Sequence, residues 1–176
     1  MSRILLVDDE ENILHALRRL FRSDGYEVET YTNATEALKR ARAAEFDLVI
    51  SDYRMLGMDG VFFLTEIKHI QPHAMRLLMS GYSDLDVLLD AINVAQIFHF
   101  IAKPWIDYDL CTTVAHALAH RAMLDENRRL ADQVRAQEDK IQRQNRLIQE
   151  LEAQSPGITQ VRRGADGAII LEEDEG

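Results

Sequence analysis

Apolar runs of strand length alternate with segments of helical spacing along the first hundred residues. The five runs are RILLV (3–7), VETY (28–31), FDLVI (46–50), MRLLM (75–79) and IFHFI (97–101). The segments between them repeat apolar residues every three or four positions, which predicts one buried helix face in each. These positions are Ile13, Leu14, Leu17 and Leu20; Ala34, Ala37, Leu38 and Ala41; Phe62, Phe63 and Ile67; and Leu85, Leu88, Leu89 and Ile92. The predicted order is β-α-β-α-β-α-β-α-β.

The five apolar runs show no regular alternation with polar residues. Such strands are typical of a sheet covered on both faces, and strict alternation with helices implies parallel strands joined by right-handed crossovers. Residues that favour helix starts support the boundaries: Asn33 and Thr35 precede the second helix, and Ser83 and Asp84 precede the fourth. The pattern predicts an open, doubly wound α/β sheet.

A different pattern begins after Pro104. From Trp105 to Ser155 the chain has neither glycine nor proline, which predicts one long helix over residues 106–154. With Val134 at position a of a heptad, a mostly apolar seam follows. Its members are Asn127, Leu130, Val134, Ile141, Ile148 and Leu151. The seam predicts a coiled coil with a second copy of the chain.

Polar residues interrupt this seam. Asn127 at an a position is the kind of residue that fixes register and favours a parallel dimer. The d positions Gln137 and Gln144 are also polar, so the alternative is that Asn127 faces solvent on a loosely packed helix. Residues 122–154 carry six basic and seven acidic side chains, which does not suit a helix that enters a DNA groove.

The last residues, 155–176, begin with Ser155, Pro156 and Gly157, which end the helix. Two short β-prone runs, ITQV (158–161) and AIIL (168–171), flank an Asp-Gly pair that suits a tight turn. An isolated hairpin is at best marginally stable in water. We expect the tail to be either disordered or a hairpin docked onto another surface.

The chain of 176 residues is acidic, with 20 basic and 30 acidic residues and a net charge of −10. Nucleic acids and anionic membranes attract positive surfaces, so this charge disfavours both as partners. The sequence has no leader pattern and no long apolar span, and its single cysteine, Cys111, cannot form an internal disulfide. We therefore expect a cytoplasmic protein that contacts neither nucleic acid nor membrane.

Polar side chains follow the predicted strands at one edge of the sheet. Asp8 and Asp9 follow the first run, Asp52 the third, Ser80 the fourth and Lys103 the fifth. Open α/β sheets bind ligands outside the carboxyl ends of their strands. Three carboxylates that meet there repel one another unless a hard cation neutralises them, and Mg²⁺ prefers oxygen ligands. The sequence therefore predicts a Mg²⁺ site.

A metal beside a lysine and a hydroxyl suits phosphoryl transfer, because cations neutralise the oxygens of the transferring group. One carboxylate is then available as the nucleophile that forms an aspartyl phosphate. Asp52 is the candidate because it stands alone after its strand, whereas Asp8 and Asp9 are paired like metal ligands. Taken singly, each of these residues is more often an ordinary cap or turn residue. Their conjunction at four strand ends favours a site.

Four motifs of the chain resemble those of one family. LLVDDEENI, VISDYRMLGMDGVFFL, LLMSGYSD and FHFIAKPW are similar in order and spacing to the receiver domain of bacterial two-component response regulators, over residues 1–120. The resemblance implies a flavodoxin-like parallel sheet with strand order 2-1-3-4-5, and a domain that accepts a phosphoryl group from a sensor histidine kinase. The motifs are also similar to receivers fused to cyclic-dinucleotide phosphodiesterases of the metal-dependent phosphohydrolase type.

The resemblance implies roles for individual residues. Asp52 would be the phosphoacceptor, and Mg²⁺ would be held by Asp8, Asp9, Asp52 and the backbone carbonyl of Arg54. Lys103 would pair with the phosphoryl group.

The same resemblance implies a switch. Ser80 would hydrogen-bond the phosphoryl group, and Phe100 would rotate inward when Ser80 moves. Arg54 and Tyr82 would tune hydrolysis of the phosphoryl group. Leu56 stands where the family usually has proline, which should loosen the loop after Asp52.

These observations predict a response regulator rather than an enzyme. It would receive its phosphoryl group from a sensor histidine kinase or a histidine phosphotransfer protein, and would act on a protein effector through a parallel, dimeric helix in place of a DNA-binding or enzymatic output domain. The alternative is a phosphorelay intermediate or phosphate sink without an effector. A phosphohydrolase of the aspartyl-phosphate type is disfavoured, because its general acid two residues after the nucleophile would here be Arg54.

Overall fold

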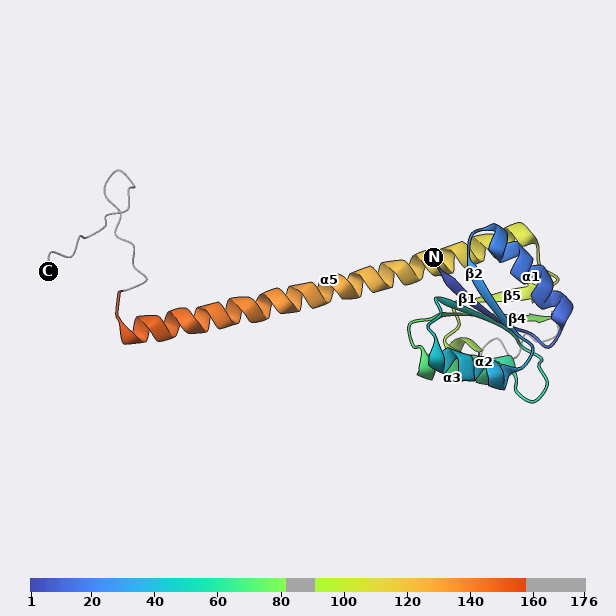
Figure 1. The fold of residues 1–176 in the computed structure, drawn as a ribbon, viewed down its shortest axis with the longest axis horizontal. Helices are drawn as coiled ribbons and strands as arrows, with labels where there is room; N and C mark the ends of the chain where they lie inside the picture. The colour runs from blue at the N-terminus through green and yellow to red at the C-terminus, as the bar shows by residue number, and fades with distance from the viewer. Residues whose placement is uncertain (82–90, 158–176) are drawn as a thin grey trace. The chain divides into compact units, whose positions relative to one another are not determined.

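The structure, a computed structural model, describes residues 1–81 and 91–157 (Figure 1). Two compact units divide the chain, residues 1–125 and 126–176. The described elements are β1 (Arg3–Val7), α1 (Glu11–Ser23), β2 (Glu27–Tyr31), α2 (Ala34–Ala43), β3 (Leu48–Asp52), α3 (Gly60–Ile70), β4 (Met75–Gly81), the short π-helix η2 (Ala91–Ala95), β5 (His99–Lys103) and α5 (Asp107–Gln154).

The five strands form one parallel sheet in the order β2-β1-β3-β4-β5, which confirms the predicted topology. The register aligns the carboxyl ends of the central strands, since Val7 pairs with Ser51 and Asp52 pairs with Met79. On the next strand, Ser80 pairs with Ala102. The polar residues that follow these positions therefore meet at one edge of the sheet.

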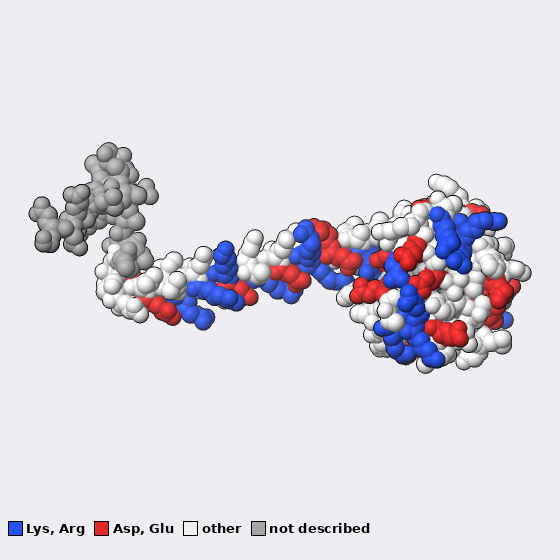
Figure 2. All heavy atoms as spheres, in the orientation of Figure 1, with Lys and Arg blue, Asp and Glu red and all other residues white. Residues whose placement is uncertain are grey.

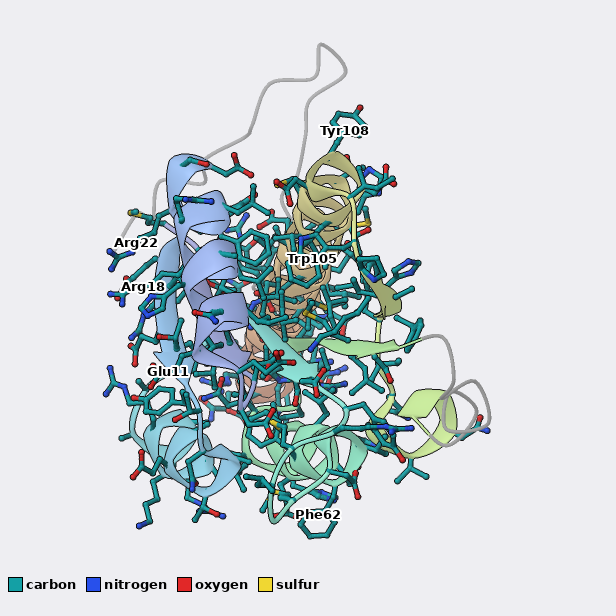
Figure 3. All side chains as sticks on the ribbon, turned by 90° about the vertical axis from the view of Figure 1, so that its right-hand side faces the viewer. Glu11, Arg18, Arg22, Phe62, Trp105 and Tyr108 are labelled. Carbon is teal, nitrogen blue, oxygen red and sulfur yellow. The ribbon has the colours of Figure 1, made fainter. Side chains whose placement is uncertain are left out.

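Helices cover both faces of the sheet, as the lack of regular alternation in the strands predicted. Helix α1 and the start of α5 lie on one face, and α2 and α3 lie on the other (Figure 3). Alternate residues of β1 point to opposite sides: Ile4 and Leu6 join the core beneath α1 and α5, whereas Leu5 and Val7 join the core beneath α2 and α3.

Local boundaries differ from the sequence prediction in a few places. Strands β3 and β5 begin two residues later than predicted, because Phe46 and Ile97 pack in the core without pairing in the sheet. Phe62 on α3 was expected on the buried face, but it is 55% exposed and points outward (Figure 3). The predicted start of the fourth helix at Ser83 and Asp84 lies outside the described residues.

The cap predicted for the second helix is confirmed. The Asn33 side chain accepts hydrogen bonds from the backbone N–H groups of Thr35 (2.9 Å) and Glu36 (3.1 Å), which satisfies two amides of the first turn of α2.

Helix α5 runs from Asp107 to Gln154, which confirms the predicted long helix. Its first turns are anchored in the domain by Leu110, Val114, Ala117 and Leu118, whereas every residue from 122 to 151 is exposed. Basic and acidic side chains intermingle along this exposed part (Figure 2). The predicted tail hairpin lies outside the described residues. None of the helices described in residues 1–81 and 91–157 is both long and apolar enough to cross a membrane.

Candidate phosphoryl and metal site

Three carboxylates meet at the carboxyl edge of the sheet. Asp8 and Asp9 follow β1, and Asp52 is the last residue of β3. Each offers one oxygen, and these oxygens all lie within 4.8 Å of one another. Asp8 and Asp52 are only 2% and 6% exposed, while Asp9 is more open to solvent. The predicted convergence of these three residues is therefore present in the structure.

Backbone amides hold the two buried carboxylates in place. The Glu10 N–H donates to Asp8 Oδ1 at 2.9 Å, and the Arg54 N–H donates to Asp52 Oδ2 at 2.9 Å. The turn after β3 thus places the Arg54 backbone at the site. A metal-binding role for its carbonyl stays a prediction.

Helix α3 approaches the site closely because its first residue is glycine. A Cβ atom at Gly60 would overlap the backbone oxygen of Asp52. The Gly60 N–H donates to the carbonyl of Tyr53 at 2.8 Å. Any side chain at this position would push the start of α3 away from the strand that carries Asp52.

Lys103, the last residue of β5, bridges the two buried carboxylates. Its Nζ lies 2.8 Å from Asp8 Oδ2 and 2.6 Å from Asp52 Oδ1. One ammonium cannot balance three carboxylates, so the cluster retains an excess of negative charge when all three are ionised. Oxygen donors with excess negative charge suit a hard divalent cation, and Asp8, Asp9 and Asp52 are the residues that would hold it.

The electrostatic balance differs between the two ends of this ion pair. Burial raises the pKa of Asp52, and it outweighs the lowering effect of the hydrogen bond and charge of Lys103. Burial is the largest single effect on Lys103 and would lower its pKa, but the hydrogen bonds to Asp52 and Asp8 and the charges of these two carboxylates together outweigh burial and raise that pKa. The lysine therefore stays charged while the buried Asp52 carboxylate is held at a cost in free energy.

This raised pKa predicts a pH dependence of stability in metal-free buffer. The native state retains a proton on Asp52 at pH values where the unfolded chain, with its ordinary pKa of 3.8, has released it. The free energy of unfolding should therefore fall as the pH rises from 3.8 through the folded-state pKa. Urea unfolding with EDTA between about pH 4 and pH 7 should show a steeper fall for the wild type than for Asp52→Asn. Equal slopes would contradict this assignment.

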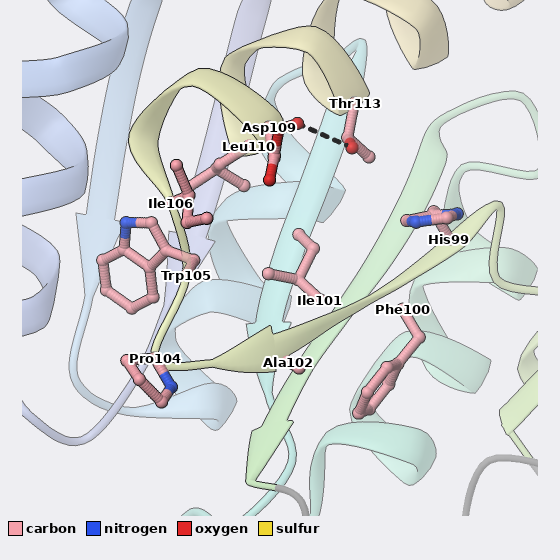
Figure 4. Close-up of a pocket in the computed structure, with 10 residues that line it drawn as sticks. All are labelled: His99, Phe100, Ile101, Ala102, Pro104, Trp105, Ile106, Asp109, Leu110 and Thr113. Atoms are coloured by element: carbon pink, nitrogen blue, oxygen red, sulfur yellow. Dashed lines mark hydrogen bonds between the residues drawn. The ribbon is translucent and has the colours of Figure 1, made fainter.

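Ser80 and Phe100, the two residues of the expected switch, lie on adjacent strands. Ser80 in β4 is 3% exposed. Phe100 in β5 packs against the core beneath α2 and α3, and it points away from Ile101 (Figure 4). Phe100 also borders a cavity of about 240 Å³ between β5 and the start of α5, beside Trp105 and Ile106. Tyr82 lies outside the described residues.

The charged residues of the site were predicted from the sequence, but the contacts that hold them in position were not. The close approach of Gly60 to Asp52 has a weak signal, since glycine at a helix start is common in turns. The sequence placed Lys103 at the same edge as Asp8 and Asp52, but not the ion pairs that its Nζ makes with both carboxylates at once.

Comparisons with known proteins agree with the resemblance seen in the sequence. Residues 4–115 match the response regulator receiver domain family. The hydrogenase transcriptional regulatory protein HoxA of Cupriavidus necator is 33% identical over 129 residues, covering 73% of this chain and 27% of that protein. The transcriptional regulatory protein ZraR of Escherichia coli K12 is 37% identical over 123 residues, covering 69% and 27%. The chain thus spans about a quarter of the length of these relatives.

A solved structure gives the same result. The signal receiver domain of an HD domain-containing protein from Pseudomonas fluorescens Pf-5 is 36% identical, covers 71% of this chain and 92% of that chain, and has a TM-score of 0.68. The family match covers more than half of the residues, and the sheet order and acidic cluster fit it. The chain belongs to the receiver domain family of bacterial two-component response regulators.

Proposed function

We propose that the chain accepts a phosphoryl group on Asp52 from the phosphohistidine of a sensor histidine kinase or a histidine phosphotransfer protein. The observation that carries this proposal is the buried Asp52 carboxylate, with Asp8 and Asp9 beside it and Lys103 Nζ 2.6 Å from its Oδ1. Asp8, Asp9, Asp52 and the carbonyl of Arg54 would hold Mg²⁺, which when bound neutralises charge on the phosphoryl oxygens.

The residues of the site divide the chemistry among them. An Asp52 oxygen attacks phosphorus as the bond to the donor imidazole breaks. The Arg54 N–H keeps Asp52 Oδ2 in place at 2.9 Å. Lys103 exchanges its contact with Asp52 for one with a phosphoryl oxygen, and the Ser80 hydroxyl donates to another. Movement of Ser80 then lets Phe100 change its rotamer. Arg54 and Tyr82 control how easily water reaches the phosphoryl group and hydrolyses it.

Phosphoryl uptake tests this assignment directly. The full chain is incubated with acetyl phosphate and Mg²⁺, and its intact mass is measured. One added phosphoryl group, located at Asp52 by peptide mapping, is the expected result. Uptake that is unchanged in EDTA would contradict the role of the metal.

We propose further that the second unit transmits this state through a parallel homodimer to a protein effector. The seam residues Val134, Ile141 and Ile148 are 53%, 55% and 48% exposed in the single chain. Exposed apolar residues at a and d positions are the part of a helix that a second helix covers. The acidic net charge supports a protein partner rather than nucleic acid for these 176 residues.

The polar seam positions favour the parallel orientation. In a parallel, in-register pair each layer meets its own copy, so Gln137 meets Gln137 and Gln144 meets Gln144. In the antiparallel register that overlaps residues 127–151, Gln137 would face Ile141 and Asn127 would face Leu151. An amide buried against an aliphatic side chain loses its hydrogen bonds to water without replacement.

Ile141→Glu should therefore dissociate the dimer. The substitution places two carboxylates face to face in the seam and removes an apolar layer, which should weaken association by more than about tenfold. Light-scattering mass across a concentration series measures this, with Gln142→Glu at an outer position as the matched control. An unchanged mass for Ile141→Glu would exclude this seam as the interface.

A further inference from the structure

Arg121 lies close to the point where α5 leaves the first unit, residues 1–125. The apolar anchoring of α5 ends at Leu118, Arg121 has a side chain only 17% exposed, and residues 122–151 are all exposed. A structural change in the first unit can therefore reach residues 122–151 only through the turn of α5 that contains Arg121.

The Arg121 guanidinium contacts two separate connections of the domain. Its Nη1 donates to the carbonyls of Phe46 (2.9 Å) and His73 (3.3 Å), which belong to the α2–β3 and α3–β4 connections. Its Nε lies 3.1 Å from Asp47 Oδ1 and 3.3 Å from Asp125 Oδ2. The planar, forked guanidinium can reach these acceptors together, which the single ammonium of a lysine could not reproduce.

Asp47, which contacts Arg121, also forms hydrogen bonds with two other strands and directly precedes a third. Its Oδ2 accepts from the Arg3 N–H at 2.7 Å, and its own N–H donates to the Arg3 carbonyl at 2.8 Å. Its carbonyl accepts from the Met75 N–H at 2.9 Å. Asp47 therefore joins the amino ends of β1, β3 and β4.

The opposite ends of the same three strands carry the proposed phosphoryl site. Asp8 follows β1, Asp52 ends β3 and Ser80 lies near the end of β4. Asp47 and Asp52 stand at the two ends of one strand, β3, and Asp47 also accepts from the first residue of β4. A displacement of β3 or β4 that reaches their amino ends would therefore change the Arg121–Asp47 contact.

We propose that Arg121 is a positioning residue that couples the phosphoryl site to α5 through Asp47. This rests on the proposed phosphoacceptor function of Asp52. A purely structural role would make Arg121 matter for stability alone, whereas coupling makes it matter for the response of α5 to the state of the site.

Hydrogen–deuterium exchange of the full chain in Mg²⁺ buffer, with and without beryllofluoride, separates the two roles. In the wild type, beryllofluoride should change exchange over residues 116–130. In Arg121→Gln this response should be lost, while acetyl phosphate still labels the variant at the wild-type rate. Arg129→Gln is the matched control, because Arg129 lies on the same helix, pairs with Glu126 at 2.6 Å and touches no strand connection in the described part of the chain.

Each result decides between the proposals. A full response in Arg121→Gln, or a wild type that is labelled but whose helix does not respond, would overturn the coupling and leave the phosphoacceptor function intact. A wild type that takes up no phosphoryl group and does not respond to beryllofluoride would overturn both. If Arg121→Gln does not fold, Asp47→Asn removes the charge from the same contact and is expected to lose the same response.

Discussion

Asp52→Asn is expected to take up no phosphoryl group under conditions that label the wild type. An amide oxygen lacks the nucleophilic charge of a carboxylate, so the bond to phosphorus cannot form at a useful rate. The variant should remain folded, because the Asn side chain can still accept the Arg54 hydrogen bond and Lys103 keeps its ion pair with Asp8. Intact mass after incubation with acetyl phosphate and Mg²⁺ measures the loss.

Asp9→Asn provides the contrast for this experiment. It keeps the acceptor and removes one expected metal ligand, so its uptake should be slow at low Mg²⁺ and recover as Mg²⁺ rises. Labelling of Asp52→Asn at a wild-type rate would place the acceptor at another residue.

Lys103→Ala is expected to destabilise the protein strongly in metal-free buffer. It leaves Asp8 and Asp52, whose side chains are 3% and 8% exposed, without the ammonium that bridges them. Removing one partner of a buried ion pair costs about 3–5 kcal/mol, because the remaining charge stays desolvated. The free energy of unfolding in EDTA, from urea titration near neutral pH, should fall by about this amount.

Two further measurements identify the cause of that loss. Added Mg²⁺ should restore part of the stability of Lys103→Ala, because a divalent cation neutralises the same carboxylates. Lys39→Ala, which removes an exposed lysine of α2, should change stability by less than about 0.5 kcal/mol. A loss that Mg²⁺ does not reduce would point to packing of the lysine stem rather than to charge.

The charged residues of the site were predictable because they depend on one rule of topology. An apolar run ends in a polar residue, and parallel strands bring such ends to one edge, so Asp8, Asp52 and Lys103 could be placed together without coordinates. The strand boundaries were less accurate: Phe46 is apolar and buried, but its N–H donates to the Gln71 side chain instead of to a neighbouring strand. An apolar residue in the sequence indicates a buried side chain, but whether its backbone pairs with a neighbouring strand depends on the register of the sheet.

Contacts between residues far apart in sequence were not predictable. Arg121 meets Phe46 across 75 positions and His73 across 48 positions. The sequence around Arg121 resembles that around the other arginines of the long helix, and nothing close to Asp47 in the sequence distinguishes it from other acidic residues next to strands. Their pairing depends on where α5 crosses the sheet, which no short stretch of sequence specifies.

Every residue from 122 to 151 is exposed in the single chain. The stability of this part of the helix should therefore depend on the concentration of the protein. Most helical stability in proteins comes from the packing of one helix face, and under the proposed pairing that packing comes from another molecule. The equilibrium then depends on how much of the protein a cell makes as well as on its phosphorylation. A change in expression level would shift the fraction of paired helices without any signal from a kinase. The amount of protein in the cell would then control dimerisation alongside phosphorylation.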